Sequence, residues 1–189
     1  MAERTAAEEL RAVPVTGKLP EYEKIKAMMQ EAFPENERYP FRLLRFWAWF
    51  DSNDFLAFYD KDVFAGIMQT FTTGDAVFIL YLAVNAKIRS HGYGSRILSY
   101  AKKYYAGKCL MLNVEPEDDK ASNSEQRRRR LAFYVANGFT DTGWILKEGE
   151  DVYQILACGE SFTQDKYRKA VGRMAFGFYA PKITKKETD

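Results

Sequence analysis

The segment Arg89 to Ser95, "RSHGYGS", combines residue types that are suited to binding phosphate. Gly92 and Gly94 have no side chain, so the backbone can come close to a ligand. Apolar residues at helical spacing follow, and a helix beginning near Tyr93 directs its free N–H groups and positive dipole end outward. Arg89 adds a charge that can hold phosphate oxygens. A corner that only caps a helix has the same local pattern, so both interpretations stay open at this point.

Two common nucleotide-binding motifs are excluded by the residues around this turn. A Walker loop needs Lys followed by Ser or Thr after its second glycine, whereas Ser95 and Arg96 follow Gly94. A dinucleotide fingerprint needs a small residue where Ile97 stands, and no acidic residue ends a strand at the expected distance. Phosphate binding is therefore supported only by the general arrangement of Arg89, the two glycines and the start of the helix.

The surrounding periodicity predicts helices and strands in a definite order. In chain order we expect helices over 20–33 and 40–50, strands over 55–59, 63–71 and 76–84, a helix over 96–107, a strand over 108–115, a helix over 122–137, a hairpin over 140–159 and a last helix within 160–181. Ser122 and Glu125 match a capping box, and Asn137-Gly138 ends that helix. The strand–helix–strand unit around the glycine turn requires parallel strands joined by a right-handed crossover.

These elements predict a single α/β domain. We expect one mixed, mostly antiparallel central sheet with flanking helices and one parallel strand–helix–strand unit at the cofactor site. The domain covers residues 1–160, a helical extension covers 161–180, and a flexible tail covers 181–189. An apolar stripe on the extension permits packing either on its own domain or on a second copy, so a monomer and a homodimer both remain open; the stripe consists of Tyr167, Val171, Met174 and Phe178.

Composition excludes several classes of function. The net charge of +2 is too small to indicate nucleic acid or membrane as the main partner. The four arginines at 127–130 point all round a helix and form no single patch. Cys109 and Cys158 lie in apolar runs as expected of buried thiols, and with His91 as the only histidine we expect no metal site. No apolar run has the length of a signal core or a membrane span, so we expect a cytoplasmic protein.

Two motifs, in order and on the expected elements, resemble a known family. Arg-x-x-Gly-x-Gly follows a strand that ends "LAV", and a late helix ends "FYVANGF", with Tyr134, Gly138 and Phe139 in the motif positions. The sequence resembles the GNAT (Gcn5-related) N-acetyltransferases over roughly residues 10–160. The resemblance implies that fold, acetyl-CoA as cosubstrate and acetyl transfer to an amine. Arg127 stands where many members have asparagine.

The resemblance also assigns a cofactor site. A backbone N–H near Val84 would polarise the thioester carbonyl, and Leu82 and Ala83 would pair with the pantetheine arm. His91 lies inside the phosphate loop, which favours a cofactor neighbour or an exposed residue over a base. The complete expected set is Leu82, Ala83, Val84, Arg89, Ser90, His91, Gly92, Tyr93, Gly94 and Ser95.

Two residues are candidates for moving protons. The resemblance makes Tyr134 the general acid for the leaving thiolate, although its helical stripe is also compatible with a core position. Glu115 ends a strand whose other residues are mostly apolar, at the edge where α/β sheets bind ligands. We therefore expect Glu115 to be the general base, directly or through water; a solvated glutamate at a strand end is the alternative.

The acceptor side is the least defined part of the sequence. The resemblance implies that the loop joining the first two helices, which contains Glu35, borders the acceptor together with Tyr81, and a carboxylate there would suit a cationic amine. Asn113 is expected to border the acceptor as well. Since both cysteines lie in apolar runs, we expect direct transfer in a ternary complex with a small-molecule or peptide amine. The alternative is a non-catalytic acyl-CoA-binding sensor or scaffold.

Overall fold

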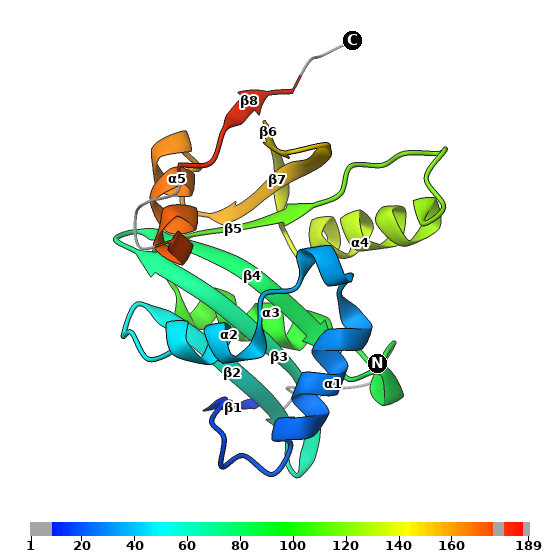
Figure 1. Ribbon diagram of the computed structural model, residues 1–189, viewed down its shortest axis with the longest axis vertical. Coiled ribbons are helices and arrows are strands. Elements are labelled where there is room, and N and C mark those ends of the chain that lie inside the picture. The colour runs from blue at the N-terminus through cyan, green and yellow to red at the C-terminus, as the bar shows by residue number, and fades with distance from the viewer. Residues whose placement is uncertain (1–8, 176–179, 187–189) are drawn as a thin grey trace, which may run out of the picture. The chain divides into compact units, whose positions relative to one another are not determined.

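The computed structural model describes residues 9–175 and 180–186. Its strands form one eight-stranded sheet in the order β1-β2-β3-β4-β5-β7-β6-β8 (Figure 1). The strands are β1 Arg11–Pro14, β2 Asn53–Asp60, β3 Val63–Thr73, β4 Ala76–Val84, β5 Cys109–Val114, β6 Thr140–Glu148, β7 Asp151–Gly159 and β8 Ile183–Lys185. The helices are α1 Tyr22–Ala32, α2 Phe41–Trp47, α3 Tyr93–Tyr104, α4 Ser124–Ala136 and α5 Gln164–Gly172, with short 3-10 turns at Glu35–Glu37, Ala86–Ile88 and Arg173–Ala175. The predicted mixed α/β sheet with flanking helices is confirmed.

The chain divides into two compact units, which are described separately. The first consists of Met1–Thr70 and Tyr81–Tyr104, and the second of Phe71–Leu80 and Tyr105–Asp189.

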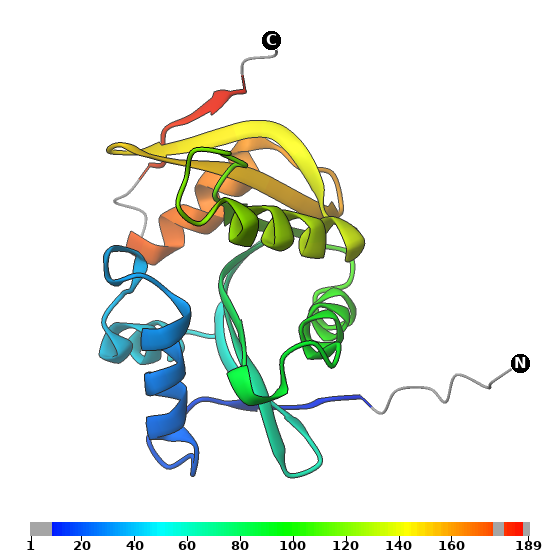
Figure 2. The same cartoon turned by 90° about the vertical axis from the view of Figure 1, so that its right-hand side faces the viewer.

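In the first unit, helices cover both faces of the strands. On β2, Phe55 packs its ring 5.6 Å from that of Phe41 in α2, whereas Phe58 packs 5.1 Å from Tyr100 in α3. Because these two positions are three residues apart along one strand, their side chains face opposite sides. α1 and α2 accordingly lie on one side of the strands and α3 on the other (Figure 2).

The second unit contains the parallel strand pair that the sequence predicted. β4 pairs in parallel with β5, from Ala76 opposite Cys109 to Phe78 opposite Met111. β5 then pairs antiparallel with β7, β7 with β6, and β6 with β8. α4 and α5 lie on opposite sides of β5 and β7 in Figure 2.

The C-terminal extension packs on its own chain. Tyr167 of α5 is fully buried, its ring centroid lies 5.8 Å from that of Phe78, and its hydroxyl donates to Oδ1 of Asn113 over 3.0 Å. Val171 of the predicted stripe is buried as well. Phe178, the last residue of that stripe, lies outside the described residues.

Three local predictions are wrong. Ile183–Lys185, expected in a flexible tail, form β8 against β6, and Arg11–Pro14 form a strand that was not expected. The predicted capping box does not form: α4 begins at Ser124, and Glu125 binds Arg129 instead. The two strands depend on partners far along the chain, which local periodicity does not reveal.

Gly66 fixes how closely β3 and β4 approach near the end of β4. A Cβ added there would lie 2.3 Å from the carbonyl oxygen of Ala83 and 3.1 Å from Cδ1 of Ile97. The first contact is with backbone, which cannot move aside as a flexible side chain can. The strands therefore require a residue without a side chain at this position.

Replacing Gly66 by alanine is expected to lower the free energy of unfolding by about 1–3 kcal/mol, the usual effect of forced overpacking. Urea denaturation of wild type and variant measures the difference. Gly17→Ala is the control, because its added Cβ would meet only the flexible end of Arg45 at 3.4 Å. Equal stability of Gly66→Ala and wild type would show that the strands can separate without loss.

Candidate functional site

The segment between β4 and α3 forms an anion-binding geometry. Gly92 has a φ of 77°, in the left-handed region that favours glycine. An added Cβ would have no neighbour within 4 Å, so glycine is required here for its backbone conformation and not for lack of space. Its carbonyl oxygen accepts the N–H of Arg96 over 3.1 Å, which closes the first turn of α3. The N–H groups of Tyr93, Gly94 and Ser95 precede the first intrahelical donor and are free to bind an anion.

The side chains of this loop are open to solvent. Arg89, Ser90 and His91 are exposed. Nδ1 of His91 lies 2.8 Å from the carbonyl oxygen of Arg89, so with its proton on Nδ1 the ring donates to the loop's own backbone. This contact makes His91 part of the loop structure.

The start of α3 is anchored to the end of β2 by Asp60. The Asp60 carboxylate accepts from Nη1 of Arg96 over 2.6 Å and from the Tyr93 hydroxyl over 3.0 Å. The Arg96 guanidinium also lies 5.1 Å from the centre of the Tyr93 ring. These hydrogen bonds, that from Arg96 first, hold the pKa of Asp60 below its usual value. Sequence reasoning missed this anchor, since Asp60 and Arg96 lie 36 residues apart in the chain.

The end of β4 is fixed by β3. The N–H of Asn85 donates to the carbonyl oxygen of Ala65 over 2.9 Å, and the Asn85 side-chain amide donates to that of Phe64 over 2.9 Å. The parallel ladder of β4 with β5 ends at Phe78, so residues 79–84 of β4 lie beyond it. Ala83 is buried, and Leu82 and Val84, also expected at the cofactor, are half-buried.

Tyr81 holds the loop between α1 and α2. Its hydroxyl donates to the carbonyl oxygen of Glu37 over 2.5 Å and accepts the N–H of Tyr39 over 3.0 Å. The Phe33 ring centroid lies 4.5 Å from that of Tyr81, and burial raises the Tyr81 pKa to about 12. The Tyr81 hydroxyl is thus bonded to the backbone of the loop that carries Glu35. Both residues were predicted to border the acceptor.

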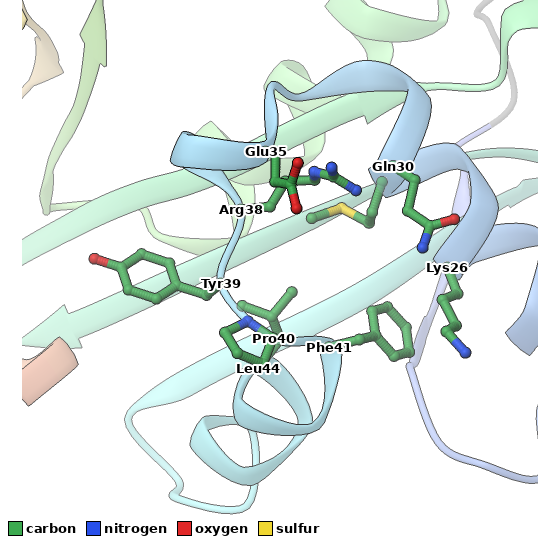
Figure 3. Close-up of a pocket in the computed structure, with 9 residues that line it drawn as sticks. Lys26, Gln30, Glu35, Arg38, Tyr39, Pro40, Phe41 and Leu44 are labelled. Atoms are coloured by element: carbon green, nitrogen blue, oxygen red, sulfur yellow. The ribbon is translucent and has the colours of Figure 1, made fainter.

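A pocket of about 260 Å³ lies against the same loop (Figure 3). Glu35 and Arg38 reach it from the loop, Lys26 and Gln30 from α1, and Leu44 from α2 (Figure 3). Met29, Tyr39, Pro40 and Phe41 complete the lining. The pocket therefore offers both signs of charge over apolar side chains, and it contains the Glu35 that the sequence indicated.

In the second unit, the Glu115 carboxylate just after β5 binds two arginines of α4. Oε1 lies 2.8 Å from Nη2 of Arg127, and Oε2 accepts from Nη1 of Arg130 over 3.2 Å. Asn123 donates its side-chain N–H to the same carboxylate over 3.3 Å. The Glu115 side chain is 19% exposed, so these ion pairs are partly shielded from water.

Arg127 occupies the position at which the resemblance implied an asparagine. Its Nε donates to Oδ1 of Asn123 over 2.8 Å and its Nη1 to the carbonyl oxygen of Pro116 over 3.3 Å, while Nη2 binds Glu115. All three nitrogens thus have acceptors within the chain. Arg127 therefore links α4 to the segment after β5.

Tyr134 is half-buried on α4, and its ring centroid lies 5.6 Å from that of the buried Phe139. Burial raises the pKa of its hydroxyl to about 12, and the charge of Arg130 acts in the opposite direction. Tyr134 is therefore protonated at neutral pH, as a proton donor must be. Asn113, which was expected to border the acceptor, accepts a hydrogen bond from the Tyr167 hydroxyl over 3.0 Å.

Three findings bear on other chemistry. Within residues 9–175 and 180–186, no three His, Cys, Asp or Glu side chains are grouped so as to hold a metal ion. In the same ranges, none of the helices has the length and apolar character needed to span a membrane. Burial raises the pKa of the Cys109 thiol to about 11, which opposes a thiolate nucleophile at this position.

Comparisons with known proteins agree with the fold. The model of the acetyltransferase (GNAT) family matches residues 22–139. No curated protein matches the chain. Among solved structures, a GNAT-family protein from Bacteroides thetaiotaomicron has a TM-score of 0.73 at 22% identity, covering 89% of this chain and 99% of its own.

Two further solved structures illustrate the range of similar proteins. A GNAT acetyltransferase from Elizabethkingia anophelis with acetyl-CoA bound has a TM-score of 0.55 at 13% identity, with 81% of this chain and 99% of that chain covered. The ribosomal-protein-S18-alanine N-acetyltransferase from Escherichia coli has a TM-score of 0.59 at 16% identity, with coverages of 82% and 96%.

The lowered pKa of Asp60 leads to a pH-dependent prediction. A carboxyl whose pKa is lower in the folded state stabilises the fold above its unfolded pKa of about 3.9, and this contribution is lost as the pH falls below that value. The stability difference between wild type and Asp60→Asn is therefore expected to be largest at pH 6 and to shrink toward pH 3.5. Urea denaturation at both pH values measures it.

Asp62→Asn is the control for this experiment, because Asp62 is exposed on the same turn. A difference between wild type and Asp60→Asn that stays constant from pH 6 to pH 3.5 would contradict the anchoring role of the Asp60 charge.

Proposed function

This chain belongs to the acetyltransferase (GNAT) family and is an N-acetyltransferase, and we propose that it transfers an acetyl group from acetyl-CoA directly to a primary amine in a ternary complex. The observation that carries the proposal is the loop from Arg89 to Ser95, where a left-handed Gly92 leads into the free N–H groups of α3. Acetyl-CoA bound to the Elizabethkingia anophelis neighbour supports the choice of cosubstrate.

We assign the cofactor to residues of the first unit. The N–H groups of Tyr93, Gly94 and Ser95 and the charge of Arg89 bind the pyrophosphate. Ser90, His91 and Gly92 shape the loop around it. The backbone of Leu82 and Ala83 pairs with the pantetheine arm, and a backbone N–H near Val84 stabilises the negative charge that develops on the thioester carbonyl oxygen.

The chemistry requires a new bond between the amine nitrogen and the acetyl carbon, and cleavage of the bond between that carbon and sulfur. The thiolate of CoA must gain a proton and the amine must lose one. We assign Tyr134 as the donor to the thiolate, since its hydroxyl stays protonated well above neutral pH. The high pKa of Cys109 supports transfer without a covalent enzyme intermediate.

The proton of the amine is assigned to Glu115, directly or through water. Its carboxylate lies just after β5, at the end of the strand, but is held by Arg127 and Arg130. Transfer through water is therefore the better-supported form of this assignment.

We propose a small-molecule or peptide amine as the acceptor. Glu35 at the pocket beside α1 and α2 supplies a carboxylate for a cationic amine, and Lys26 and Arg38 supply charges for an anionic group on the same molecule. Tyr81 contributes by holding the loop that carries Glu35. Asn113 contributes less directly, because its side-chain oxygen is bonded to Tyr167.

Binding of acetyl-CoA is tested by isothermal titration of wild type and an Arg89→Ala/Gly94→Asp variant. We expect a micromolar dissociation constant for wild type, which corresponds to about 8 kcal/mol. The variant should lose most of this affinity, because an added carboxylate then faces the pyrophosphate. Asp is well tolerated in the first turn of a helix, so the fold should persist.

Lys103→Ala, at the other end of α3, should bind like wild type in that titration. No heat of binding with wild type would remove the cofactor assignment and with it the proposed reaction.

Tyr134→Phe is expected to lower kcat by about 100-fold and to leave the KM for acetyl-CoA nearly unchanged, since a general acid acts only during the reaction. Release of free CoA is followed with a panel of amines that contains spermidine, free lysine and a peptide with an N-terminal alanine. Tyr153→Phe, a half-buried tyrosine of β7, is the matched control. Unchanged kcat in Tyr134→Phe would exclude Tyr134 as the proton donor, and binding without turnover by wild type would favour a sensor.

A further inference from the structure

α4 is weakly held by apolar packing. None of its thirteen residues, Ser124–Ala136, all of which the structure describes, is fully buried. By contrast, α3 buries Ile97, Leu98 and Ala101. The N-cap residue of α4 also makes no side-chain capping bond. Since helices in proteins are stabilised mainly by burying an apolar face, another interaction must fix α4 in place.

The cluster around Glu115 supplies that interaction. One carboxylate binds Arg127 and Arg130, on successive turns of α4, and Asn123 joins it from the N-cap position. The arginine side chains are 20% and 32% exposed, respectively, whereas the ion pairs of Arg129 and Arg128 with Glu125 are much more open to water. Partly buried, charge-assisted hydrogen bonds of this kind are stronger than exposed pairs.

The cluster extends to Tyr134 through Arg130. Residues four apart on a helix lie on one face, so Arg130 lies one turn before Tyr134 on the same side of α4. Burial raises the pKa of the Tyr134 hydroxyl and the charge of Arg130 acts in the opposite direction, as the shared face of the helix implies. Glu115 determines where this arginine lies, because it accepts from Nη1 of Arg130 over 3.2 Å.

We propose that Glu115 is a positioning residue for the proton donor: its carboxylate clamps Arg127 and Arg130 of α4 to the segment after β5 and thereby holds the Tyr134 hydroxyl in its working position. This inference rests on the proposed function, in which Tyr134 protonates the thiolate. It adds a role to Glu115 that does not require the carboxylate to exchange a proton with the amine.

The two roles of Glu115 make different predictions in a double-mutant cycle. A base acts on the amine, so its loss lowers kcat whether or not Tyr134 can donate a proton. A positioning residue acts only through Tyr134, so its loss has no further effect once the hydroxyl is gone. The cycle therefore consists of wild type, Glu115→Gln, Tyr134→Phe and the double variant.

CoA release from acetyl-CoA is measured with the amine of the above panel that reacts fastest, or with water as acceptor if none reacts. We expect Glu115→Gln to lower kcat by at least about tenfold, since small displacements of a catalytic group are sufficient for this. The KM for acetyl-CoA should change little. In the Tyr134→Phe background the same substitution should lower kcat less than twofold, and Arg127→Met should reproduce the effect of Glu115→Gln.

Glu125→Gln is the control, because Glu125 is an exposed ion-pair partner on the same helix; it should retain wild-type kcat. Circular dichroism verifies that each variant is folded at the assay temperature. A full additional loss from Glu115→Gln in the Tyr134→Phe background would overturn the positioning role while leaving Tyr134 as the donor. Wild-type kcat in Tyr134→Phe would instead remove the donor itself, and the positioning role with it.

Discussion

The parallel pairing of β4 with β5 is the constraint from which the site follows. Two parallel strands cannot be joined by a tight turn, so the chain must leave β4, cross over through α3 and return to the start of β5. The start of α3 is therefore reached directly from the carboxyl end of β4. A helix N-terminus at that edge is where α/β sheets bind anionic ligands, and the two glycines allow the ligand to come close.

Polar side chains add directional contacts to the segments that carry the candidate site. Asp60 anchors the first turn of α3, Tyr81 holds the loop before α2, and Glu115 binds α4. In each case one side chain of a strand or strand end accepts or donates several hydrogen bonds to a neighbouring segment. Such contacts are directional, so they specify position where apolar packing would allow sliding.

The sequence predicted what depends on local patterns. Glycines, apolar periodicity and the motif around Tyr134 were sufficient for the order of the main elements and for the start of α3 at Tyr93. Interactions between residues far apart in the chain produce no local pattern in the sequence, so they were not predicted. The bond between Asp60 and Arg96, the strand at Ile183–Lys185 and the partners of Tyr81 all depend on which segments meet in space. The last of these adds a structural role to Tyr81, which supports the loop between α1 and α2.

Arg127 shows why the role of a single motif position does not transfer by itself. An arginine in place of asparagine brings a charge that requires an acceptor, and here Glu115, Asn123 and the carbonyl of Pro116 supply acceptors for all three nitrogens. The substitution, the carboxylate and the N-cap amide therefore form one unit. The Asn123 side chain bonds to Glu115 and Arg127 and does not cap α4, so the helix lacks a side-chain capping bond.

The same unit restricts how a proton can leave the amine. If Glu115 took up that proton directly, its charge would be lost and both ion pairs to α4 would weaken in every reaction cycle. Tyr134 would then be held least firmly when the thiolate needs its proton. In the form of the proposal that acts through water, a water molecule oriented by the Glu115 carboxylate passes the proton on to solvent, so the clamp stays charged throughout. Glu115 thus cannot both take up the proton directly and hold the acid firmly in the same step. Its short ion pairs to Arg127 and Arg130 favour the positioning role.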